Sequence, residues 1–182
     1  MQKEIVFAGF GGQGVMLAGQ FLAYAAMEQG FEVVWLPSYG PEMRGGTANC
    51  VVLVADRPIA SPIVPRPYAA VVMNNPSLER FGQAVRPGGV VVVNSSLVNL
   101  ALVRSDVTQV LVPANNIAMD LGSGKAANMV ALGACVGATG CVSMEVLRRF
   151  VAKKFSSKPQ FVELNLKALD AGLAAARAGS AK

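Results

Sequence analysis

Gly9-Phe10-Gly11-Gly12-Gln13-Gly14 separates an apolar run over residues 4–8 from a long helical pattern that starts near Val15. The glycines at positions 9, 11 and 14 fit the spacing G-x-G-x-x-G. A strand, a glycine-rich loop and a helix in this order offer backbone N–H groups and a positive helix end to a phosphate or another anion. The stretch therefore predicts a loop that binds a ligand or partner, with a purely structural tight turn as the alternative.

Apolar runs alternate with helical patterns along the rest of the chain. After the first strand at 4–8 we expect strands at 31–36, 47–55, 69–73, 90–93 and 109–112. Pro37 is expected to end the second of these strands, and segment 59–64 fits either a short strand or a loop. Helices are expected at 12–29, 76–85, 114–121, 127–138, 144–155 and 161–177.

Continuously apolar strands between helices are typical of a parallel sheet covered on both faces. Neither an internal repeat nor a linker divides the chain. The sequence therefore predicts a single α/β domain over residues 1–182. Its expected form is one doubly wound, mostly parallel sheet with a Rossmann-like glycine loop after the first strand.

The composition is unusually apolar, with 53% hydrophobic and 15% charged residues and a mean hydropathy of +0.44. Globular domains usually carry about 25% charged residues. This deficit predicts that other subunits cover much of the surface, because obligate interfaces resemble a core cut in half. The uncharged stretch 126–144 contains Asn128, Thr139 and Ser143, which favours a buried or interface helix over a membrane span.

The net charge of +5 and the three cysteines exclude other classes of function. Arg148, Arg149, Lys153 and Lys154 form the densest basic group, but no nucleic-acid motif accompanies them. We therefore interpret them as a solvated helix face. The cysteines have no metal-like spacing and resemble small buried hydrophobes of a reducing, cytoplasmic compartment. The chain enters a strand at once, so no signal peptide is expected.

Residues that the chain lacks limit its chemistry further. There is no histidine, no C-x-x-C pair and no phosphate loop ending in Gly-Lys-Ser/Thr. An acidic residue that would hold an NAD ribose should end the second strand, whereas Glu32 lies at its beginning. We thus expect no catalytic residue, no metal site and poor NAD binding. Glu42 is expected to anchor its loop, and Lys125 either binds an anion at a helix start or lies in a loop that only caps that helix.

Six short motifs lie along the chain: GFGGQG at 9–14, LPSYGPEMRGG at 36–46, TANC at 47–50, SPI at 61–63, NNP at 74–76 and KAANM at 125–129. Together they resemble the gamma subunit of 2-oxoacid:ferredoxin oxidoreductases. The resemblance covers most of the chain, from about residue 3 to the last helix. The loop sequence in 36–46 is most similar to the 2-oxoglutarate and branched-chain 2-oxoacid types.

The resemblance implies a role inside a larger complex. Such complexes oxidatively decarboxylate a 2-oxoacid, here expected to be 2-oxoglutarate, form an acyl-CoA and pass electrons to ferredoxin. Thiamine diphosphate, magnesium and iron–sulfur clusters would lie on alpha, beta and ferredoxin-like partner subunits. This chain would contribute assembly surface and help to bind coenzyme A, and alone it would be inactive.

Coenzyme A also suits the chemistry of two loops. Arg44 offers a bidentate cation to phosphate, and Tyr39 offers a ring on which an adenine can stack. Ligands gather at the carboxyl edge of such sheets, so both loops should lie together there. The predicted cofactor-binding residues are Gly9, Gly11, Gly12, Gln13, Gly14, Ser38, Tyr39 and Arg44.

Three other interpretations stay open at this point. The loops can form a contact with a partner subunit and bind no small ligand. The chain can be a stand-alone Rossmann-type dehydrogenase that uses a nucleotide. It can also be a structural assembly module whose glycine loop packs against a partner backbone.

Overall fold

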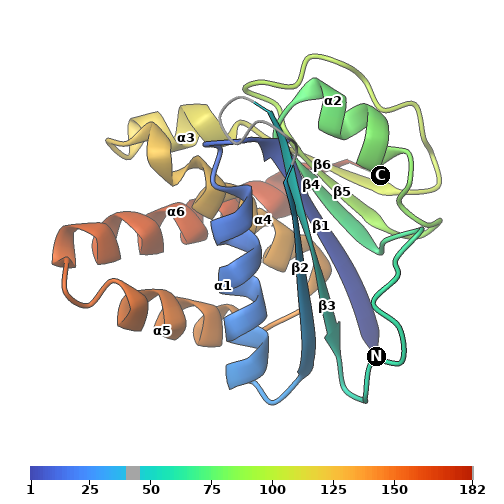
Figure 1. Ribbon diagram of the computed structural model, residues 1–182. Coiled ribbons are helices and arrows are strands. Elements are labelled where there is room, and N and C mark those ends of the chain that lie inside the picture. Colours follow the sequence, from blue (N-terminus) through green and yellow to red (C-terminus); the bar gives the residue numbers. More distant parts are fainter. Residues whose placement is uncertain (40–45, 182) are drawn as a thin grey trace.

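The computed structural model describes residues 1–39 and 46–181, and within them one sheet organises the chain (Figure 1). Its strands follow the order β2-β3-β1-β4-β5-β6-β7. The predicted single-sheet α/β fold is confirmed. The strands are β1 (Gln2–Phe10), β2 (Glu32–Tyr39), β3 (Thr47–Ala55), β4 (Ala69–Val72), β5 (Val90–Asn94), β6 (Thr108–Val112) and β7 (Ser180–Ala181).

The sheet is mixed. Strands β1, β4, β5 and β6 pair in parallel, whereas β3 is antiparallel to both of its neighbours, β1 and β2. Strand β2 therefore runs in the same direction as β1, and both end at the same edge of the sheet. β7 adds a short antiparallel pairing to β6.

Helices cover the two faces unequally (Figure 1). One face carries α1 on β1–β3, and α4 and α6 farther along the sheet. Of the helices in the described ranges, only the short α2 with its continuation η1 lies on the other face. The helices are α1 (Val15–Glu28), α2 (Asn75–Ser77), η1 (Leu78–Gly82), α3 (Ala114–Asp120), η2 (Gly124–Ala126), α4 (Ala127–Thr139), α5 (Met144–Lys154) and α6 (Pro159–Ala178).

Alternate residues of the central strands β1, β4 and β5 enter one of two apolar cores, as the two-residue period of a strand requires. Ile5 and Phe7 of β1 belong to the larger core beneath α1 and α4. Val6 and Ala8 belong to a smaller core beneath α2 and the segment 95–107. Both faces of the central strands are thus buried, which explains why their sequences are apolar throughout.

Two local predictions need correction. Strand β2 continues through Pro37 to Tyr39, because an edge strand tolerates a residue that cannot donate to a neighbour. Segment 59–64, predicted as either a short strand or a loop, is a loop. The helix expected over 76–85 is a short α-turn that widens into a π-type turn over Leu78–Gly82.

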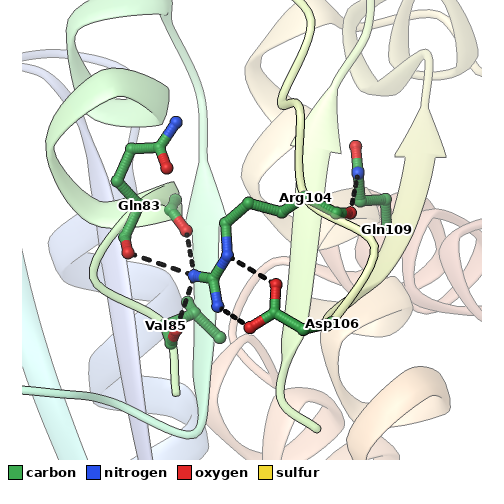
Figure 2. Close-up of polar contacts among 6 residues, drawn as sticks. Gln83, Val85, Arg104, Asp106 and Gln109 are labelled. Carbon is green, nitrogen blue, oxygen red and sulfur yellow. Dashed lines mark hydrogen bonds and ion pairs between the residues drawn. The ribbon is translucent and has the colours of Figure 1, made fainter. Parts of the chain in front are cut away.

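Arg104 ties the irregular segment 95–107 to the thinly covered face (Figure 2). Its Nη1 donates to the carbonyls of Gln83 (3.1 Å) and Val85 (2.6 Å), just beyond η1. Its Nε donates to Asp106 Oδ1 at 2.9 Å, and this contact holds the pKa of Asp106 below its usual value. Gln109 of β6 donates to the carbonyl of Arg104 at 3.1 Å. Through its guanidinium and its backbone carbonyl, Arg104 therefore joins the end of η1 to the strand β6.

Helices α4 and α6 cross with their backbones in contact. A Cβ atom at Gly172 would overlap the carbonyl oxygen of Val130, and one at Gly133 would overlap that of Leu169. Backbone atoms cannot move aside as a side chain can. Gly137, the second glycine of α4, is less tightly packed against backbone, since a Cβ there would first meet the flexible end of the Leu173 side chain.

We predict that Gly172→Ala lowers the free energy of unfolding by at least about 2 kcal/mol, because overpacking outweighs the gain in helix propensity. Urea unfolding followed by circular dichroism measures the change. Gly137→Ala is the matched control and should cost clearly less. Equal or greater stability of Gly172→Ala would show that the two helices are not in backbone contact.

Candidate functional site

The glycine loop leaves the sheet at the edge where β1 and β2 end. Gly9 of β1 and Tyr39 of β2 both pair with Ala48 of the intervening β3. The N–H of Gly11 donates to the carbonyl of Gly46 at 2.9 Å. Gly9–Gly14 and the backbone of Ser38 and Tyr39 therefore lie at one edge of the sheet. Arg44, Glu42 and the side chain of Tyr39 fall outside the described residues.

The turn between β1 and α1 depends on glycine at three positions. Gly12 and Gly14 have φ of +98° and +75°, a left-handed backbone that other residues rarely adopt. A Cβ at Gly14 would lie 2.5 Å from Asn128 Nδ2, and a Cβ at Gly9 would lie 2.5 Å from Gln13 Oε1. Turn geometry and packing alone thus require these glycines. This agrees with the alternative prediction of a purely structural tight turn.

Gln13 folds back onto the sheet edge. Its Oε1 accepts from the N–H of Phe10 at 2.6 Å, and its Nε2 donates to the carbonyl of Met73 at 3.1 Å. Asn74 Nδ2 donates to the same Oε1 at 3.4 Å. The side chain that was predicted to bind a ligand therefore joins the ends of β1 and β4.

Backbone donors remain available around Gly12. Helix α1 starts at the N-cap Gly14 without a side-chain cap, so the N–H groups of its first turn have no intrahelical acceptor. The N–H groups of Gly12 and Gly14 make no backbone hydrogen bond within the described residues. Apart from its chain neighbours, no atom of residues 1–39 and 46–181 lies within 4 Å of a Cβ built on Gly12. This part of the chain thus leaves the loop tip open, and the helix gives the tip a partial positive charge.

Two hollows flank Gly12. The first has a volume of about 340 Å³ and is mostly apolar. The second has a volume of about 190 Å³ and is more polar. The first is lined by Phe10, Gly11, Gly12, Gly14, Val15, Met16, Leu17 and Ala48. The second is lined by Gly12, Gln13, Met73, Asn115, Gly124, Lys125 and Ala127.

The second hollow lies where the order of the strands reverses. β1 and β4 are parallel neighbours, but the chain leaves β1 toward β2 and leaves β4 toward β5. Ligands of open α/β sheets bind in the crevice at such a point. Lys125, the predicted anion-binding candidate, lines this hollow together with Gly12. It makes no ion pair within the described residues.

Asn115 is a residue of this hollow that local sequence patterns did not indicate. Its Oδ1 accepts from Asn94 Nδ2 at 2.8 Å, and Asn94 Oδ1 accepts from the N–H of Ala114 at 3.1 Å. Asn94 ends β5, so the strand fixes the orientation of Asn115. No hydrogen bond within the described residues uses Asn115 Nδ2. An asparagine directly after a buried strand is the signal that could have indicated this pair.

The described part of the site is suited to binding rather than to acid–base or metal chemistry. It brings together backbone N–H groups, a lysine and an amide, which can donate hydrogen bonds to a ligand. No group of three Cys, Asp or Glu side chains that could hold a metal occurs among residues 1–39 and 46–181. Glu32 begins β2, at the edge opposite the loop, where it cannot reach a ribose bound there. Within the same ranges no helix is both long and apolar enough to cross a bilayer.

The cysteines lie away from the loop tip, inside the core. All three are free and fully buried. Burial raises the pKa of Cys50, which lies under α1, to about 11. A hydrogen bond with Cys141 and burial hold the pKa of Cys135 well above its usual range. An iron–sulfur cluster takes four accessible thiolates, so these three thiols do not fit one.

Comparison with known proteins identifies the family. The model of the pyruvate ferredoxin/flavodoxin oxidoreductase family matches residues 4–175, so the chain belongs to this family. The chain is 39% identical over 94% of its length to ketoisovalerate oxidoreductase subunit VorA of Methanothermobacter marburgensis, of which the match covers 36%. The chain thus spans little more than a third of the first curated relatives that it matches.

Two solved structures share the fold. The keto/oxoacid ferredoxin oxidoreductase gamma subunit of Geobacter sulfurreducens has a TM-score of 0.83 and 35% identity, with 97% of this chain and 99% of that chain covered. The 2-oxoglutarate:ferredoxin oxidoreductase of Magnetococcus marinus, solved with 2-oxoglutarate, coenzyme A and succinyl-CoA, has a TM-score of 0.90 and 26% identity. That match covers 100% of this chain and 32% of the other. The predicted resemblance to gamma subunits is confirmed.

We predict that Gln13→Ala destabilises the chain by about 1–2 kcal/mol, because the Phe10 N–H and the Met73 carbonyl lose their shared partner. Amide exchange at Phe10 should also become faster. Hydrogen-exchange mass spectrometry and urea unfolding measure both effects. Gln20→Ala, on the outer side of α1, is the control. If both variants are equally stable, Gln13 does not join the two strands.

The thiols provide a separate prediction. In the native chain at pH 8, none of the three cysteines should react with a maleimide within minutes, since all three thiols are buried. For Cys50 and Cys135 the raised pKa also disfavours the reactive thiolate. In denaturant all three should react at once. Mass spectrometry counts the labels. Rapid labelling of Cys50 in the native state would contradict its burial beneath α1.

Proposed function

We propose that this chain is the gamma subunit of a 2-oxoacid:ferredoxin oxidoreductase complex. The complex oxidatively decarboxylates a 2-oxoacid, transfers the acyl group to coenzyme A and passes the electrons to ferredoxin. The near-complete match of the chain to a gamma subunit in both directions supports this proposal. The proposed 2-oxoacid is 2-oxoglutarate or a branched-chain 2-oxoacid, as the names of the relatives suggest.

The residues of this chain do not perform the redox step. They include no histidine, and their three thiols are buried in the core. Thiamine diphosphate, magnesium, iron–sulfur clusters and the ferredoxin contact are therefore proposed to belong to alpha, beta and ferredoxin-like partner subunits. The proposed task of this chain is to bind and orient coenzyme A, whose thiol receives the acyl group, and to hold the complex together.

The edge around Gly12 supports coenzyme A as the ligand. Coenzyme A carries several phosphates, and the open backbone at Gly12 lies at the N-terminus of α1, where anions bind favourably. Lys125 and the free Asn115 Nδ2 line the adjoining hollow. The observation that carries the proposal is the convergence on one glycine loop of a cation and several donors from distant segments, none of which has a partner among residues 1–39 and 46–181.

The individual roles follow from the chemistry of each group. Gly11, Gly12 and Gly14 would let the backbone approach a phosphate, and Lys125 would neutralise it. Arg44 would add a bidentate contact, and Tyr39 would stack on the adenine, with Ser38 beside it. Gly9 and Gln13 would keep the loop in shape rather than touch the ligand.

We predict that Arg44→Ala and Lys125→Ala each raise the KM for coenzyme A about tenfold, the effect of one lost charge-assisted contact. The rate at saturating coenzyme A should stay unchanged, because both side chains would bind the phosphates and not the reacting thiol. The assay uses the assembled complex, and gel filtration checks that it is intact. Lys154→Ala, an exposed lysine on α5, is the control.

The same variants distinguish ligand binding from assembly. If Arg44→Ala dissociates the complex while the remaining enzyme keeps its dependence on coenzyme A, the loop is an interface. The ligand proposal is then wrong. An intact complex with an unchanged KM for both variants would also contradict it.

A further inference from the structure

Helix α1 lacks the polar outer face that a surface helix normally has. Among its 14 residues only Gln20 and Glu28 are strongly polar. Phe21, Leu22 and their neighbours are buried against the sheet. A helix that is apolar all round is typical of an element buried on every side.

The side of α1 that faces away from the sheet is nevertheless exposed. Leu17, Tyr24 and Met27 lie about seven and three residues apart, which places them on one side of a helix. Their exposed fractions are 37%, 47% and 58%. In Figure 1 this helix runs along the front of the β1–β3 part of the sheet, with α5 beside it. We call Leu17, Tyr24 and Met27 the α1 stripe.

The α1 stripe continues into the larger hollow at its N-terminal end. Leu17 and Met16 line that hollow together with Phe10, which is 37% exposed. A volume of about 340 Å³ is large enough to receive an aromatic or aliphatic side chain. Buried anchors of this kind dominate the affinity of protein interfaces.

Tyr24 is already held in place for such a contact. Its ring stacks on Phe150 of α5, with centroids 5.4 Å apart and planes inclined by 17°. A fixed aromatic side chain loses little conformational entropy when a partner binds. The stripe thus contains a preorganised tyrosine of the type found at interface hot spots.

The flank of the stripe is positively charged. Arg149 and Lys153 of α5 both face the single carboxylate of Glu28, at 3.9 Å and 3.8 Å. Two cationic side chains thus share one carboxylate, and both cationic side chains are mostly exposed. A partner that covers the stripe would be complementary if its rim carried acidic side chains.

The length of the relatives indicates what kind of partner this is. Two of them contain this domain within a chain most of which lies outside the match. The proposed function assigns the equivalent of that remainder to a partner subunit. Because a domain and the chain fused to it in relatives usually contact each other, the remainder is the natural cover for an unpartnered apolar helix.

We propose that the α1 stripe is the surface through which this chain binds a partner subunit that is equivalent to the remainder of the longer relatives. The partner's contacting surface is apolar, inserts a side chain near Leu17 and carries an acidic rim opposite Arg149 and Lys153. This inference rests on the proposed function, since it takes the partner to be a subunit of the same oxidoreductase.

The test starts from the affinity-tagged full chain, purified from its own cells with its complex. The complex is identified by 2-oxoacid oxidation and by its thiamine diphosphate and iron content. Met27→Arg should weaken assembly at least about 100-fold, because an arginine would be buried against an apolar surface. Met119→Arg is the matched control, since Met119 lies on α3 with 66% exposure, and it should assemble normally.

A second measurement does not depend on folding of the arginine variant. A photoreactive phenylalanine analogue at position 24 in the intact complex should crosslink to the partner subunit. Crosslinks only to a second copy of this chain, or only within the chain, would overturn the inference. Normal assembly of Met27→Arg would overturn it too. If the wild-type chain purifies with no thiamine diphosphate-containing subunit, the proposed function itself fails, which is a different outcome.

Discussion

The left-handed backbone at Gly12 and Gly14 is the constraint on which the candidate site depends. It lets the chain turn from β1 into α1 within four residues, so that the start of the helix lies directly above the sheet edge. Gln13 then joins β1 to β4 through the Met73 carbonyl, and Asn128 Nδ2 donates to the carbonyl of Gly14 at 3.2 Å. The turn therefore sets where α4 and Lys125 lie relative to the loop.

The apolar composition and the arrangement of α1 have a common explanation in assembly. The chain buries two cores, yet it still exposes the apolar stripe on α1. The proposed function requires donors for coenzyme A at one edge of the sheet and a stable contact with partner subunits elsewhere. The glycine loop offers such donors, and the α1 stripe begins beside it. The proposed ligand site and the proposed assembly surface thus meet at the start of one helix, so that a movement of the partner would act on a bound ligand.

Much of the fold could be predicted from the sequence, but strand direction could not. The buried β3 is apolar because both of its faces are covered, and this pattern is the same for parallel and antiparallel strands. Its antiparallel pairing depends on long-range contacts with β1 and β2. The prediction that Pro37 ends the second strand was wrong, because a proline is tolerated in an edge strand. Whether a strand lies at the edge of the sheet is also a non-local property.

The candidate site was predictable only in its local part. Gly9–Gly14 and Ser38 follow strand ends that the hydrophobic pattern indicates, so their common edge could be inferred. Asn115 and Lys125 come from segments about a hundred residues away, and their place beside Gly12 follows from the sheet order. Gln13 changed its expected role, because no sequence pattern shows that its side chain folds back onto Met73. A structure of the assembled complex with coenzyme A, determined by electron cryomicroscopy, tests the account most directly. The account predicts a coenzyme A phosphate at the Gly12 loop beside Lys125, with a partner subunit over α1. Coenzyme A bound wholly on other subunits, with the Gly12 loop covered by protein, would contradict it.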